Sequence, residues 1–311
     1  MNGMTLTWKR TPANTIVPVG PGVYFAPAKG ASLTARAAVL SGLLPPEAVI
    51  ARRTAAWIWG LDVLPPGMDE TDWPVDLITP EPSTPPTPDT VEVPPDHAIE
   101  KSGIRLTTPI RTALDCARWL PRLEAVAALD QFLRKGVSTE AVTTMARTLP
   151  GYRRNKKLRE VIRLSDRGAA SPGETWTRVA IVNTGLPRPE TQVPVMGPQA
   201  RRLYIDLGYP DFRVGLEYDG ERHHTGPGAL AHDKARRRWL AKQMHWEIIP
   251  VTKDFLITPA PYLEALLTAL LHRGWNPDNE TMAKVETRLA TLKRRPHRPH
   301  RPLPTRTLSH L

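Results

Sequence analysis

The clearest pattern of apolar and polar positions lies in the last third of the chain. Residues 171–184 repeat apolar positions at helical spacing and open with Ser171-Pro172-Gly173-Glu174, a capping box with proline in the first turn. Runs with strand-like patterns follow at 189–196, 202–207 and 212–218, separated by Gly-Pro and Tyr-Pro-Asp turns. A long helical pattern over 228–244 and a strand over 246–251 complete the series. The sequence therefore predicts the element order α-β-β-β-α-β.

The preceding part of the chain is patterned mainly as helix. A turn and short strand are predicted over 17–26 and a strand over 75–79, and helical spacing recurs over 32–44, 47–59, 111–120, 123–133, 138–148 and 155–164. We therefore expect a mainly α-helical N-terminal region with a small β element, followed by an α/β domain. Further helices are predicted over 260–272 and 281–292, before a basic, disordered tail over 294–304.

Proline content divides the chain further. The 34 prolines among 311 residues are about twice the usual share. No lysine or arginine occurs from 54 to 100, and the acidic, proline-rich segment 80–97 is expected to be an extended linker or loop. The predicted division is a mostly helical region over 1–165, a domain over 166–275, and a helix with a basic tail over 276–311.

The net charge and the hydropathy of the chain indicate which kinds of molecule the protein could bind. A net charge of +11 favours a polyanion, although an arginine-rich, solvated surface gives the same balance. Cys116, the one cysteine, follows a helical apolar pattern and is expected to be a core thiol. The chain shows neither a membrane-spanning run nor a signal peptide, so we expect a cytoplasmic protein with no membrane partner.

Acidic residues end two of the predicted strands. Asp206 follows an apolar approach on the second strand, and Glu217 and Asp219 end the third. Residues two apart on a strand share a face, so Glu217 and Asp219 are expected to point the same way. Carboxylates crowded at neighbouring strand ends lower stability unless a cation lies between them. Because Mg²⁺ or Mn²⁺ held in this way activates water against a phosphodiester, we interpret the cluster as a metal site.

These motifs resemble a known nuclease family. Asp206, Glu217-Tyr218-Asp219-Gly220 and His223-His224, followed by a basic helix and a strand, are similar to the Vsr-like branch of the PD-(D/E)XK nuclease superfamily. The segments Ala55–Gly60 and Thr108–Asp115 resemble the AbiEi-antitoxin-like region that precedes this branch in actinobacterial proteins. The resemblance implies a restriction-endonuclease-like core, Mg²⁺ dependence and DNA cleavage.

The resemblance also assigns residues to roles. It implies Asp206, Glu217 and Asp219 as metal ligands, Glu174 as the first-helix acid and His224 as a catalytic histidine. Two features depart from the family pattern. Aspartate stands at position 219, where the motif has lysine, and the N-terminal winged-helix pair has no counterpart before residue 17.

A structural role is open for several of these positions. Glu174 fits its own capping box, and Asp219-Gly220 is a common turn pair. On the basic helix, Lys234, Arg237 and Arg238 either contact phosphates or form a solvated face.

Two functions remain open. The first is a metal-dependent DNA endonuclease acting in repair or phage defence. The second is a non-catalytic, antitoxin-like protein that keeps a nuclease fold to bind nucleic acid or a toxin partner.

Overall fold

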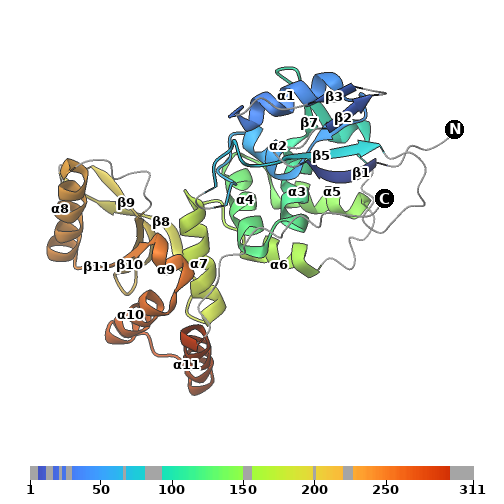
Figure 1. Ribbon diagram of the computed structural model, residues 1–311. Helices are drawn as coiled ribbons and strands as arrows, with labels where there is room; N and C mark the ends of the chain where they lie inside the picture. Colours follow the sequence, from blue (N-terminus) through green and yellow to red (C-terminus); the bar gives the residue numbers. More distant parts are fainter. Residues whose placement is uncertain are drawn as a thin grey trace. The chain divides into compact units, whose positions relative to one another are not determined.

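The computed structural model divides the chain into two compact units, Met1–Pro172 and Gly173–Leu311 (Figure 1). It describes residues 6–11, 17–20, 23–25, 30–65, 68–80, 93–149, 156–198, 201–219 and 227–294. Residues 81–92 of the linker expected over 80–97, and the basic tail from 295, lie outside these ranges. The described end of that segment forms a 3-10 turn over Pro95–His97.

A five-stranded sheet, ordered β1-β5-β4-β7-β6, organises the N-terminal unit. Its central strand β4 runs parallel to β7, and the other neighbours are antiparallel. A separate hairpin joins β2 to β3 and confirms the strand predicted near residue 20. The strands are β1 (Leu6–Thr11), β2 (Val17–Gly20), β3 (Val23–Phe25), β4 (Val49–Ile50), β5 (Val75–Pro80), β6 (Ala98–Lys101) and β7 (Ile104–Thr107).

The helices of this unit follow the sequence pattern closely. They are α1 (Leu33–Leu43), α2 (Arg52–Ile58), the 3-10 turn η1 (Pro95–His97), α3 (Pro109–Trp119), α4 (Arg122–Arg134), α5 (Thr139–Thr148) and α6 (Lys156–Leu164). Ser32, Thr108 and Ser138 cap α1, α3 and α5 through their side-chain oxygens, which accept hydrogen bonds from backbone N–H groups. Cys116 is fully buried on α3, which confirms the core thiol, and burial raises its pKa.

The N-terminal unit contains more sheet than the pattern predicted. The expected helix over 47–59 was wrong in its first half, because residues 49 and 50 form β4 between β5 and β7. A two-residue strand carries too little alternation to be recognised. Strands β1, β6 and β7 of the same sheet were also missed. The unit is therefore a sheet with helices packed on it.

The C-terminal unit has the predicted order of elements. These are α7 (Pro172–Thr184), β8 (Glu190–Met196), β9 (Arg202–Tyr209), β10 (Val214–Asp219), α8 (Pro227–Met244) and β11 (Glu247–Thr252), followed by α9 (Lys253–Ile257), α10 (Ala260–His272) and α11 (Asn279–Arg294). The sheet is ordered β11-β10-β9-β8. The pair β10–β11 is parallel because α8 crosses between the two strands, and the other pairs are antiparallel.

Helices cover both faces of this sheet, with α8 on one side and α7 and α10 on the other (Figure 1). Leu207 and Leu216 face α7, α10 and α11, in a cluster that includes Ile181, Leu263 and Val285. The opposite face packs on α8 in a smaller cluster of Val193, Val195, Ile205, Leu240 and Trp246. Side chains of β10 on this face therefore point towards α8, the helix that the sequence predicted to be basic.

No helix in the described part of the chain has both the length and the apolar character needed to span a membrane.

Candidate active site

Asp206 of β9 and Glu217 of β10 lie where the hydrogen-bonded pairing between these two strands ends. The antiparallel register pairs Leu207 with Leu216, so the next pair along is Asp206 with Glu217. The backbone N–H of Tyr218 donates a hydrogen bond of 2.9 Å to Asp206 Oδ2, in place of a further ladder bond. The predicted convergence of Asp206 and Glu217 is therefore present at this end of the strands.

Strand alternation places Glu217 and Asp219 on the α8 side of the sheet, as expected. Arg237 of α8 reaches both of them, whereas Tyr218 between them turns to the opposite side and packs on the larger apolar cluster. Gly173 at the start of α7 accommodates that tyrosine, because a Cβ atom at Gly173 would lie 2.1 Å from the Tyr218 ring. The glycine thus lets α7 approach the strand that carries the acids.

Two arginines of α8 form ion pairs with the acids of β10. Arg237 Nη2 donates to both oxygens of Asp219, at 2.5 and 2.6 Å, and its Nε donates to Glu217 Oε2 at 3.3 Å. Arg236 Nη2 lies 3.0 Å from Glu217 Oε1 and also donates to the backbone oxygen of Tyr204. Glu217 Oε1 is buried and accepts no hydrogen bond from the described residues.

Burial raises the pKa values of both Asp206 and Glu217. Desolvation raises the pKa of Asp206, against the hydrogen bond from Tyr218 and the charge of Arg236. Desolvation likewise raises the pKa of Glu217, which is 5% exposed, although Arg236 and Arg237 pull that pKa down. The arginines therefore compensate only part of the cost of burying these charges.

Glu174 joins the cluster through a residue that the sequence analysis missed. Gln192 Nε2 donates a hydrogen bond of 3.0 Å to Glu174 Oε2, and the Gln192 side chain also hydrogen-bonds Asp206. Glu174 is 6% exposed, so the first-helix acid is buried beside the strand ends. A glutamine in a strand pattern carries no signal of such a role, because its side chain is uncharged and common on sheet surfaces.

The remaining predicted site residues are placed as follows. Arg237 contacts acids of its own chain, and Arg238 beside it is exposed. His224 and the side chain of Lys234 lie outside the described residues. Within the described ranges, no group of three or more His, Cys, Asp and Glu side chains is arranged to hold a metal ion. In this arrangement Arg237 contacts both oxygens of Asp219, and Arg236 and Arg237 each pair with one oxygen of Glu217.

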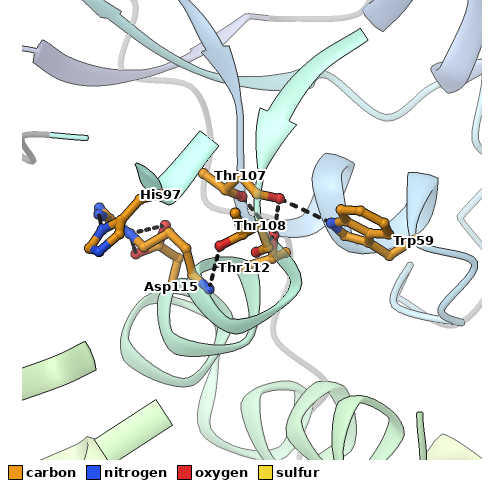
Figure 2. A network of polar contacts seen from close by, with 7 residues as sticks. Trp59, His97, Thr107, Thr108, Thr112 and Asp115 are labelled. Carbon is orange, nitrogen blue, oxygen red and sulfur yellow. Dashed lines mark hydrogen bonds and ion pairs between the residues drawn. The ribbon is translucent and has the colours of Figure 1, made fainter. Parts of the chain in front are cut away.

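A second buried polar network lies in the N-terminal unit (Figure 2). Arg111 Nε donates to both oxygens of Asp115 at 3.0 Å, and its Nη1 lies 3.2 Å from His97 Nδ1. Trp59 Nε1 donates to the backbone oxygen of Thr107, whose hydroxyl lies 2.6 Å from that of Thr112. The network joins the segment around Trp59 to the start of α3, and its burial indicates a structural role.

Comparison with known proteins adds relatives without a described activity. Two proteins of Mycobacterium tuberculosis, "Uncharacterized protein MT2308" of strain CDC 1551 and "Uncharacterized protein Rv2248" of strain H37Rv, are each 32% identical to this chain over 154 residues. The match covers 49% of this chain and 56% of each relative, so the chain spans about half the length of these relatives. No family model and no solved structure matches.

Proposed function

We propose that the C-terminal unit is a metal-dependent endonuclease of the Vsr-like PD-(D/E)XK type, which hydrolyses phosphodiester bonds in DNA. The observation that carries the proposal is the opposed pair of largely buried carboxylates, Asp206 and Glu217, each with a raised pKa. Like charges buried together are costly, and a divalent cation between them removes that cost.

The donor set fits a small hard cation. Oxygen ligands from two carboxylates suit Mg²⁺ or Mn²⁺. The buried Glu217 Oε1 lies 3.0 Å from Arg236 Nη2 but accepts no hydrogen bond from the described residues. The order α-β-β-β-α-β and the mixed sheet β11-β10-β9-β8 agree with the restriction-endonuclease-like core that the resemblance implies.

Each residue has a task in this proposal. Asp206 and Glu217 hold the ion, which supplies charge neutralisation and activation of water when bound. Arg237 takes the place of the motif lysine as a cation beside Glu217, and Asp219 fixes its guanidinium. Arg238, exposed on α8, contacts the phosphate backbone.

The arginine ion pairs also favour a second candidate. Arg236 and Arg237 neutralise Glu217 and Asp219 within the chain, as side chains do in a site that needs no metal. The second candidate is accordingly a non-catalytic, antitoxin-like protein that binds nucleic acid or a toxin through a retained nuclease fold.

Plasmid cleavage separates the two candidates. Purified protein is incubated with supercoiled plasmid and Mg²⁺ or Mn²⁺, beside the isosteric variants Asp206→Asn and Glu217→Gln. Asp211→Asn is the matched control, since Asp211 is an exposed acid in the turn between β9 and β10. We expect nicking by the wild type and the control, and loss in both site variants. Equal cleavage by all four proteins contradicts the assignment, and absent cleavage with retained DNA binding favours the second candidate.

A further inference from the structure

The ladder between β8 and β9 is interrupted at one position beside the acids. Thr191 pairs with Leu207 and Val193 pairs with Ile205, but the pair between them, Gln192 with Asp206, is absent from the ladder. Residues opposite one another on neighbouring antiparallel strands share a face, so the two side chains lie on the same side of the sheet. Side-chain contact replaces the backbone pairing at this position.

The backbone of Gln192 is strained. Its φ is 50°, in the left-handed region that residues other than glycine, asparagine and aspartate rarely adopt. Such conformations persist where the surrounding structure requires them, and they concentrate at functional sites. Here the conformation accompanies an amide side chain that lies between two acids.

The amide connects acids from different elements. Gln192 Nε2 donates to Glu174 Oε2 of α7 at 3.0 Å, and the same side chain hydrogen-bonds Asp206 of β9. An amide nitrogen carries two hydrogens and no charge, so it can donate to two carboxylates without neutralising either.

We propose that Gln192 is a positioning residue that ties the Asp206 carboxylate, one of the two proposed metal ligands, to the Glu174 carboxylate of α7. The inference rests on the proposed nuclease function and extends it by one residue. It also accounts for the strained backbone, because this conformation accompanies an amide that contacts both acids.

Glycine at position 192 tests this role without disturbing the backbone. Gln192→Gly removes the amide, and φ of 50° is relaxed for glycine, so the melting temperature should stay the same or rise. Loss of residues that orient metal ligands typically lowers metal affinity or activity by about 10- to 100-fold. We expect a loss of that size in Mn²⁺-dependent plasmid cleavage and in Mn²⁺ affinity.

A matched control and a metal titration exclude a merely structural effect. His245 is exposed and also has a positive φ, 56°, so His245→Gly relaxes the backbone of the same unit without touching the acids. It should leave cleavage unchanged. In Gln192→Gly the Mn²⁺ concentration that gives half-maximal cleavage should rise, although the melting temperature does not fall. Gln192→Asn, which tolerates positive φ but is shorter, should show the same loss.

The outcomes are distinguishable. If the wild type neither binds Mn²⁺ nor cleaves, the proposed function fails and the inference fails with it. If the wild type cleaves, and both Gln192 variants match its rate and its Mn²⁺ affinity, the nuclease assignment stands and the role of Gln192 is overturned.

Discussion

Replacing Asp115 by asparagine should strongly destabilise the N-terminal unit. The Arg111 and Asp115 side chains are both fully buried, with Arg111 Nε 3.0 Å from each carboxylate oxygen. Asp115→Asn keeps the shape of the side chain and removes its charge, so the buried guanidinium loses this counter-charge. His97, 3.2 Å away, offers no negative charge in compensation.

The expected size follows from burial. Removing one partner of a buried ion pair costs about 3–5 kcal/mol. For a unit of this size, 1 kcal/mol corresponds to roughly 2–4 °C in melting temperature, so the transition should fall by about 6–20 °C. The exposed pair Glu280–Lys284 on α11, with side chains 78% and 58% exposed, serves as the control. Glu280→Gln should cost less than about 1 kcal/mol.

Urea denaturation followed by circular dichroism measures both changes, with calorimetry giving the melting temperatures. A loss below about 1 kcal/mol in Asp115→Asn, equal to that in Glu280→Gln, would refute the view that this network holds α3 in place.

Two further predictions concern the acids and their support. Gly173→Ala should cost about 1–3 kcal/mol of stability by overpacking, since its Cβ would lie 2.1–2.5 Å from three Tyr218 ring atoms. The control Gly42→Ala has open space around its Cβ and should not destabilise the protein. Equal melting temperatures of the two variants would contradict this prediction. The raised pKa values of Asp206 and Glu217 mean that the native state binds protons more tightly than the unfolded chain. These groups therefore lower stability fully above their folded pKa values, and this penalty disappears as the pH falls from there to their unfolded pKa values. The double variant Asp206→Asn/Glu217→Gln should therefore melt higher than the wild type at pH 7, with a gap that narrows as pH falls; a gap that widens would contradict the sign.

The long helices and strands were predictable from the sequence because apolar residues recur regularly along the whole face that each element buries. Helices α3, α4 and α5 and the order from α7 to β11 agree with the expected ranges within a few residues. The short strand β4 was missed because two residues carry no period, although both are buried between β5 and β7. Its identity depends on partners far along the chain, which a local pattern does not contain.

The candidate site was predictable only in part, for a similar reason. Asp206, Glu217 and Asp219 stand out because charges rarely follow apolar strand residues. Gln192 and Arg236 have no such signal, since their roles depend on register and on the face of α8 that packs on the sheet. Arg237 was expected either on phosphates or on a solvated face, and it contacts Glu217 and Asp219, an interaction that helical spacing alone does not reveal.

Calorimetric titration of Mn²⁺ into the wild type and into Asp206→Asn/Glu217→Gln tests the central claim most directly. The account predicts saturable binding to the wild type that is lost in the double variant, with Asp211→Asn binding as the wild type does. Absence of binding in the wild type, or equal binding in all three proteins, would contradict a metal site at the ends of β9 and β10.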